Sequence, residues 1–300
     1  MIKLASFFRA TTFLAIVSIF LWSTAFSVVK IGLQYHTPLQ FAGLRFAIAG
    51  LLVFIFLGKP LFFFRQVRQH WQFVLLISVL QVSGQYALFY LGLNLIPGSL
   101  GALIIGSSPL FVALIAHFHI SNDKLTPMKI SSFIIGIFGI AIIAVGRQRM
   151  EFGGRLEWLG ILLLLGNNIL SGYSNVLVFK GKKKIHPVVL SSSSLFSGGL
   201  ALFLISLFFE GLPHHSFPTS YYLSLGWLSF LSAVAVSIWF SLLSRPGTQV
   251  STLNTWKFLI PVLGAVLSWI LIPNEHPDML QILAMLIIAL ALILLNSGKK

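Results

Sequence analysis

Long apolar runs separated by short polar stretches dominate this chain. Runs such as 130–145 and 279–295 approach the length needed to cross a bilayer as a helix, about 20 mostly apolar residues. A membrane barrel would instead show segments of about ten residues with alternating polarity. Helices also satisfy their own backbone hydrogen bonds within lipid. The pattern predicts an all-α membrane protein with ten transmembrane helices, near 12–32, 38–58, 71–93, 98–119, 128–146, 157–179, 187–209, 220–243, 248–272 and 278–296.

The connections between these spans are short, and none is long enough to hold a soluble domain. The first span has one alternative interpretation, a secretory signal peptide, because small residues at Ser23 and Ala25 follow a basic start and an apolar stretch. Trp22 and Phe26 are poor neighbours for a cleavage site, and apolar residues continue beyond it. We therefore favour a transmembrane span.

Composition supports a lipid environment. Apolar residues make up 57% of the chain and charged residues 9%, against about 45–50% and about 25% in soluble domains. The net charge of +14 lies mostly in short loops, which indicates membrane topology and contact with anionic lipid head groups, and predicts no nucleic-acid partner. The absence of cysteine excludes disulfides, thiol catalysis and cysteine-based metal sites.

Basic residues predict the orientation. Ten spans place both termini on one side, and assigning that side to the cytoplasm gives it fourteen loop cations against four on the other. The fourteen are Lys3, Arg9, Lys59, Arg65, Arg68, Lys124, Lys129, Lys180, Lys182, Lys183, Lys184, Arg245, Lys299 and Lys300. We expect a multi-pass protein of the inner (plasma) membrane with cytoplasmic termini, and read the lysine run 182–184 as a topology anchor.

The two halves of the chain resemble each other. Segments 109–123 and 261–275 share a proline, an alanine and a terminal Asn-acid pair at one constant offset, and Ser99 and Ser251 fall on the same offset. The pattern predicts two five-helix repeats, 1–150 and 151–300. Five spans are an odd number, so the second repeat must be inverted, a plan that recurs in secondary transporters.

Several motifs carry a family resemblance. Residues 22–26 through Lys30, then 37–41 leading to Arg45, and 107–114 followed by an Asn-Asp pair, resemble EamA-type members of the drug/metabolite transporter superfamily. The resemblance covers the whole chain with loose motifs. It implies ten helices in an inverted five-plus-five repeat, cytoplasmic termini and export of metabolites or amino acids. Ile260 stands where the family often has a glutamate, so the family's coupling mechanism does not transfer directly.

Two basic residues, Arg45 and Lys257, fall deep within predicted spans, where a charge costs at least about 2.5–3.5 kcal/mol. All six acidic residues fall in loops or at span ends. An anionic group on the solute is one candidate partner for Lys257. Alternatively, Lys257 is uncharged at rest and takes part in proton coupling. Arg45 could also snorkel or cap neighbouring carbonyls.

Polar and aromatic side chains repeat at helical spacing in several spans. Ser78, Gln81 and Gln85 are expected to share one face, as are Asn168, Ser171 and Asn175. Such residues either line a solute pathway or hydrogen-bond between packed helices. The predicted solute-binding residues are Lys257, Asn254, Trp22, Gln81, Gln85, Tyr86, Asn168, Asn175 and Arg45. The prolines at 109 and 261 are expected to kink their spans.

These observations predict a secondary transporter that works by alternating access. Its partners would be membrane lipid and a small solute, with an anionic or zwitterionic solute as a candidate, and the expected task is efflux of amino acids or related metabolites. A channel or uniporter is the first rival and a membrane-embedded transferase a weaker one, so we predict no enzymatic activity. We predict no cofactor and no metal site, since His117 and His119 lie two residues apart on different helix faces. The oligomeric state is left open.

Overall fold

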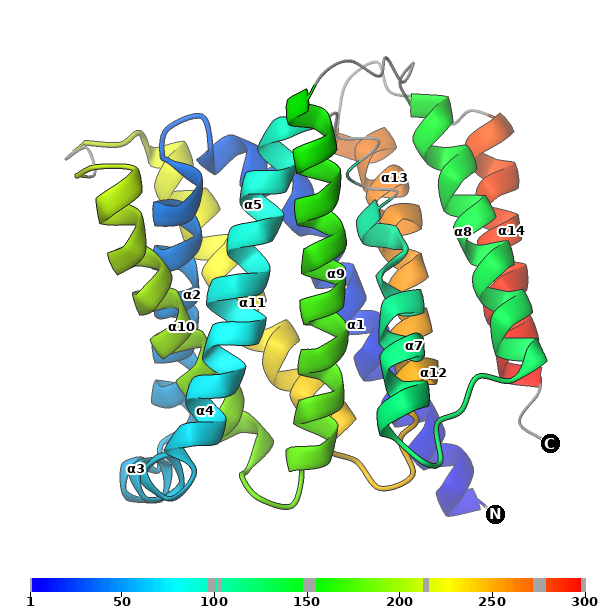
Figure 1. Cartoon of the computed structure of the whole chain (residues 1–300), viewed down its shortest axis with the longest axis horizontal. Helices are drawn as coiled ribbons and strands as arrows, with labels where there is room; N and C mark the ends of the chain where they lie inside the picture. Colours follow the sequence, from blue (N-terminus) through cyan, green and yellow to red (C-terminus); the bar gives the residue numbers. More distant parts are fainter. Residues whose placement is uncertain are drawn as a thin grey trace. The chain divides into compact units, whose positions relative to one another are not determined.

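A computed structural model describes residues 2–96, 101, 104–147, 155–212, 216–271 and 279–297. Within these ranges the secondary structure is helical, without strands (Figure 1). The helices are α1 (Ile2–Gly32), α2 (Pro38–Leu57), α3 (Pro60–Gln69), α4 (Trp71–Ile77), the π-helix η1 (Ser78–Gly84), α5 (Gln85–Leu95), α7 (Ser108–His119), α8 (Pro127–Arg147), α9 (Arg155–Gly181), α10 (Pro187–Phe209), α11 (Thr219–Leu243), α12 (Val250–Thr255), the 3-10 turn η2 (Trp256–Phe258), α13 (Leu259–Leu271) and α14 (Met279–Ser297).

Five described helical segments are long and apolar enough to cross a membrane: Pro38–Leu57, Trp71–Leu95, Leu156–Gly181, Pro187–Phe209 and Thr219–Leu243. Four shorter apolar segments lie in α1, α7, α8 and α14. The all-helical class predicted from the sequence is therefore observed, and five of the ten predicted spans meet the length criterion within the described residues. Residues 98–100, 102–103 and 272–278, where three predicted spans begin or end, lie outside the described ranges.

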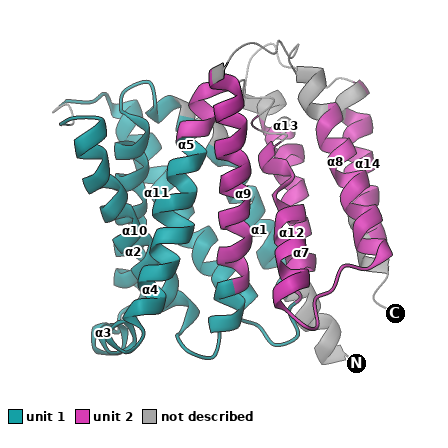
Figure 2. Cartoon of the chain, in the orientation of Figure 1, with its two compact units in different colours: residues 1–90, 177–248 teal, residues 91–176, 249–300 magenta. Residues whose placement is uncertain are grey.

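The described residues group into two compact units (Figure 2). Unit 1 contains residues 1–90 and 177–248, and unit 2 contains residues 91–176 and 249–300. Each unit therefore combines segments from both halves of the sequence. The sequence predicts two repeats that meet at residue 150. A repeat need not coincide with a compact unit, so this division stays a prediction.

Helices α2 and α10 form the tightest contact in unit 1. A Cβ placed on Gly43 would lie 2.6 Å from the backbone nitrogen of Phe203, and one on Gly50 would lie 2.6 Å from the carbonyl oxygen of Ser192. The hydroxyl of Ser192 donates to the carbonyl of Gly50 at 2.8 Å. Residue numbers fall on α10 as they rise on α2, so the two helices run antiparallel. Small residues permit this close approach, which supplies dispersion contacts where lipid gives little hydrophobic drive.

The start of α2 is held by an acidic residue from the end of α10. The backbone N–H groups of Leu39 and Gln40 donate to the two carboxylate oxygens of Glu210 at 2.9 and 3.0 Å. The first N–H groups of a helix lack intrahelical partners and carry the positive end of its dipole, so a carboxylate stabilises them. At the other end of α2, Gly58 adopts φ 62° and closes the helix.

Residues 60–69, expected to be part of a connection, form α3 instead. Gly58 turns the chain, and Pro60 then supplies the fixed φ that suits the first turn of a helix. The ten residues mix three phenylalanines with two arginines, so no apolar run long enough to suggest a span is present.

Unit 2 has its own core, in which Phe133 and Ile140 of α8, Phe258 of η2 and Ala284 and Ile288 of α14 are buried together.

Candidate functional site

The most distinctive buried charge of unit 1 is Arg45, on α2. It is 4% exposed, and its Nη1 donates to the hydroxyl of Tyr90 at 2.9 Å. The guanidinium carbon lies 4.3 Å from the ring centre of Phe46, 5.6 Å from that of Tyr86 and 6.0 Å from that of Tyr90. Within the described residues, the hydrogen-bond acceptor of Arg45 is this phenol and not a carbonyl, and the side chain is buried. It is enclosed by aromatic rings, which attract a cation through their quadrupoles.

Arg45 retains unused hydrogen-bonding capacity. Its Nε is buried without a hydrogen-bond partner in the described structure. The one ion pair between described residues joins Lys129 and Asp123, so no described carboxylate neutralises Arg45. A buried cation that has a neutral phenol as its hydrogen-bond acceptor is suited to receive an anion.

Gln81 and Gln85 belong to the region where the third predicted span departs from α-helical geometry. Gln81 lies in the π-helix η1, and its Oε1 is buried without a hydrogen-bond partner among the described residues. The expected shared face of Ser78, Gln81 and Gln85 assumed α-helical spacing, which a π segment interrupts. Ser78 contacts α10, where its hydroxyl lies 2.7 Å from that of Ser197. π-Helical turns are frequent at functional sites.

Trp22, on α1, packs edge-on against Trp239 of α11, with ring centres 5.1 Å apart. Trp239 is 2% exposed, whereas Trp22 is partly exposed. A second contact joins the same two helices, because the indole N–H of Trp227 donates to the hydroxyl of Thr24 at 3.1 Å. Trp22 thus contributes to the packing of α1 against α11 and also presents part of its ring surface.

In unit 2, three predicted asparagines connect helices. The side-chain amide of Asn168, on α9, donates to the carbonyl of Ile104 at 2.6 Å. The amide of Asn254, on α12, donates to the side-chain oxygen of Asn175 at 3.3 Å, while its own Oδ1 is buried without a partner in the described part. Asn168 therefore holds two segments together, and the pair Asn175–Asn254 leaves one acceptor available.

Lys257 lies at a break in its helix. The ninth predicted span consists of α12, the 3-10 turn η2 and α13, and Lys257 is the central residue of η2. Pro261 has no N–H to donate to the carbonyl four residues earlier, which is that of Lys257. The structure therefore shows an interruption of regular α-helix just before this proline, and the expected kink itself stays a prediction. A short 3-10 stretch within a helix often marks a hinge.

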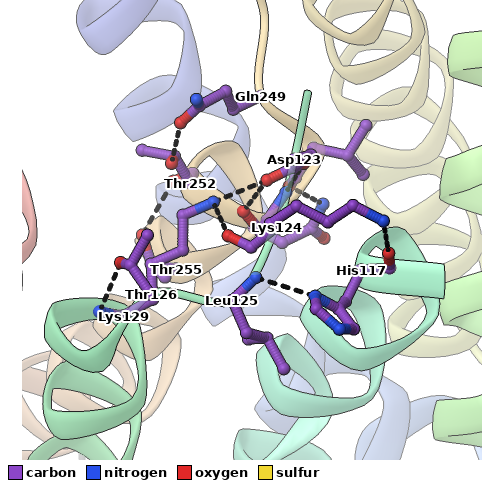
Figure 3. Close-up of polar contacts among 12 residues, drawn as sticks. His117, Asp123, Lys124, Leu125, Thr126, Lys129, Gln249, Thr252 and Thr255 are labelled. Carbon is purple, nitrogen blue, oxygen red and sulfur yellow. Dashed lines mark hydrogen bonds and ion pairs between the residues drawn. The ribbon is translucent and has the colours of Figure 1, made fainter. Parts of the chain in front are cut away.

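The structure also contains a polar cluster around Asp123, which the sequence did not predict (Figure 3). Asp123 is 2% exposed. Its carboxylate accepts a hydrogen bond from Nζ of Lys129 at 2.7 Å, from the N–H of Ser251 at 2.8 Å, and from the Ser251 hydroxyl. Lys129 was interpreted from the sequence as a topology cation only. The available signal was the Asn-Asp pair, but nothing in the chain order places Ser251 beside it.

The predicted site residues thus fall into two groups. In unit 1 the structure brings Arg45 into contact with Tyr86, and in unit 2 it brings Asn175 into contact with Asn254. Within the described residues there is no group of three or more His, Asp or Glu side chains arranged to hold a metal ion. The polar groups offer hydrogen bonds and one buried positive charge, which suits binding of a polar solute.

Comparison with known proteins supports the same class. The model of the EamA-like transporter family matches residues 9–145 and again residues 158–297. A Bacillus subtilis (strain 168) protein named "Uncharacterized transporter YvbV" is 26% identical over 94% of this chain and 90% of its own length. An Escherichia coli (strain K12) protein named "Probable amino-acid metabolite efflux pump" is 27% identical over 92% of this chain and 91% of its own.

A solved crystal structure shares the fold with a TM-score of 0.83 at 17% identity, covering 97% of this chain and 99% of the other. The resemblance first noted from short motifs is confirmed by a family match that extends over most of the chain. Relatives bearing transporter and efflux-pump names also place the chain outside the enzymes. The chain belongs to the EamA-like transporter family.

Proposed function

We propose that this protein is a secondary transporter that exports amino acids or related small metabolites across the inner membrane by alternating access. Ten spans in two inverted repeats, residues 1–150 and 151–300, would carry this function, with both termini in the cytoplasm. The positive-inside bias supports the orientation. The name of the E. coli relative, an amino-acid metabolite efflux pump, supports the solute class.

The proposed solute class rests on the burial of Arg45 without a carboxylate partner among the described residues. A guanidinium desolvated by aromatic rings is costly unless a counter-ion approaches it. Its hydrogen bond to Tyr90 and its contact with Tyr86 fix its position, and its Nε is available. A carboxylate can accept two hydrogen bonds from a guanidinium, which supplies both charge and orientation. We therefore propose that Arg45 binds the carboxylate of the solute.

The remaining candidates have supporting roles in this proposal. In unit 1, Gln81 and Tyr86 would contact the polar part of the solute, with Gln85 and Trp22 as further contacts. In unit 2, Asn254 and Lys257 lie at the helix break before Pro261, where a change of helix direction would accompany opening and closing. Asn168 and Asn175 would hold the surrounding helices together.

The test compares matched solutes in proteoliposomes. An amino acid, its carboxamide and its decarboxylated amine are offered to the wild-type protein and to Arg45→Met, with Arg45→Lys as a charge-preserving variant. We expect Arg45→Met to slow uptake of the amino acid at least tenfold, because a charged hydrogen bond is worth about 1.5–3 kcal/mol. Uptake of the two analogues, which lack the carboxylate, should change much less.

Lys124→Met serves as the matched control, since Lys124 is an exposed cation outside both groups of candidate residues. It should leave uptake of all three solutes unchanged. Equal losses for the amino acid and its amide in Arg45→Met would show that Arg45 has a structural role. Fluorescence-detected size-exclusion chromatography of each variant separates that outcome from simple misfolding.

A further inference from the structure

Helix α3 lies across the ends of its neighbours in unit 1. Figure 1 shows α3 nearly end-on, while α2 and α4 run along the page. One side of α3 is anchored, because Phe63 is 9% exposed and its ring centre lies 4.8 Å from that of Phe54 on α2. The other sides face outward: Leu61 is 87% exposed and Phe64 is 61% exposed. An exposed apolar surface of this kind, beside the end of a helix long enough to span a membrane, is unfavourable in water unless another apolar surface covers it.

The connection between α9 and α10 adjoins α3. The backbone N–H of His186 donates to the side-chain oxygen of Gln66 at 3.2 Å. The rings of His186 and Phe62 meet edge-on with centres 5.8 Å apart. Two segments more than a hundred residues apart in the chain therefore form one surface. We call it the basic-aromatic face, and it comprises Lys59, Leu61, Phe62, Phe64, Arg65, Arg68, Lys182, Lys183 and Lys184.

The charge of this face has one sign. Segments 57–70 and 180–186 together contain seven lysines and arginines and no acidic residue. Lys59, Arg65, Arg68, Lys183 and Lys184 are exposed. None of them takes part in the one ion pair found among the described residues. Exposed cations interleaved with exposed aromatic and aliphatic side chains are typical of helices that lie in the membrane interface.

We propose that the basic-aromatic face binds the phosphate-bearing head groups of anionic phospholipids in the adjoining leaflet. Leu61 and Phe64 enter the boundary of the acyl chains, and Arg65, Arg68 and the lysine run 182–184 contact the head groups. Charge complementarity selects this occupant, because each cation near an anionic membrane surface contributes about 1 kcal/mol. The lysine run then binds lipid as well as setting topology. This proposal does not depend on which solute the protein carries.

A single-cysteine label tests the location of α3. The chain contains no cysteine, so Phe64→Cys gives one site for a nitroxide in the full-length protein. In bilayers of phosphatidylcholine with phosphatidylglycerol, we expect the label to collide more readily with oxygen than with a water-soluble nickel complex. Preferential collision with the nickel complex would place α3 in water and overturn the proposal.

The contribution of the cations is measured by native mass spectrometry of the full-length protein with bound phosphatidylglycerol. Arg65→Gln and Arg68→Gln should each weaken retention of this lipid about fivefold, corresponding to about 1 kcal/mol per cation. Arg65→Lys keeps the charge and should retain the lipid. The matched control Lys124→Gln removes an exposed cation elsewhere and should have no effect. An equal loss in Lys124→Gln, or no loss in the arginine variants, would contradict the proposal.

Discussion

At the scale of single residues, Arg45 and Asp123 differ in how their buried charges are compensated. Asp123 accepts hydrogen bonds from Lys129 and from both the N–H and the hydroxyl of Ser251. Arg45 has one neutral hydrogen-bond partner, Tyr90, and three aromatic rings around it. A buried charge with a full set of partners stabilises structure, whereas one with unused capacity is suited to binding. We therefore propose a structural role for Asp123 and a binding role for Arg45.

This assignment predicts how Asp123 variants unfold. Asp123→Asn keeps the shape of the side chain but leaves Lys129 buried without its counter-ion, so we expect a loss of about 3 kcal/mol in the free energy of unfolding. Adding Lys129→Met should recover much of that loss, because no uncompensated cation remains. Chemical unfolding in detergent gives both values. A double variant no more stable than Asp123→Asn would contradict the ion-pair explanation.

Neither set of contacts could be derived from the sequence. Arg45 and Tyr90 are 45 residues apart, and Asp123 and Ser251 are 128 residues apart. The sequence indicated that Arg45 needed a partner, because a charge within an apolar run is costly. It did not indicate which one, since pairing across helices depends on their rotation and depth, and an apolar pattern fixes these only loosely.

At the scale of elements, prolines and glycines made several helix boundaries predictable. The predicted spans 38–58 and 187–209 agree closely with α2 (Pro38–Leu57) and α10 (Pro187–Phe209), because a proline begins each helix. The π-helix η1 was not anticipated, since its hydrogen-bond register leaves no mark on an apolar sequence. The break at η2 was expected only through Pro261. Helix α3 was missed because it is short and amphipathic.

The antiparallel contact of α2 with α10 gives a prediction with an internal control. Gly50→Ala places a methyl group against the backbone of α10, so we expect a loss of about 1–3 kcal/mol from overpacking. Gly226→Ala, within α11, meets nothing within 4 Å. It should be neutral or stabilise the protein by up to about 1 kcal/mol through helix propensity. Thermal unfolding of both variants in one detergent measures the difference, and similar behaviour would refute the close-contact interpretation.

At the scale of the whole molecule, the compact units do not coincide with the sequence halves. Unit 1 combines α2 from the first half with α10 from the second, and unit 2 combines α8 with α14. Helices α2 and α10 hold corresponding places in the two proposed repeats, and they run antiparallel, as inversion requires. At the start of α10 the side chain of Gln66 accepts a hydrogen bond from a backbone N–H, as the side chain of Glu210 does at the start of α2. These relations support the inverted-repeat proposal from within unit 1.

We propose that this protein is a carrier, which binds its solute on one side of the membrane and releases it on the other. Counterflow in proteoliposomes tests it most directly. With unlabelled amino acid inside, a carrier should take up labelled amino acid from outside transiently above equilibrium, with a rate that saturates. Uptake that rises linearly with concentration and does not depend on the internal solute would instead indicate a channel and contradict the carrier proposal.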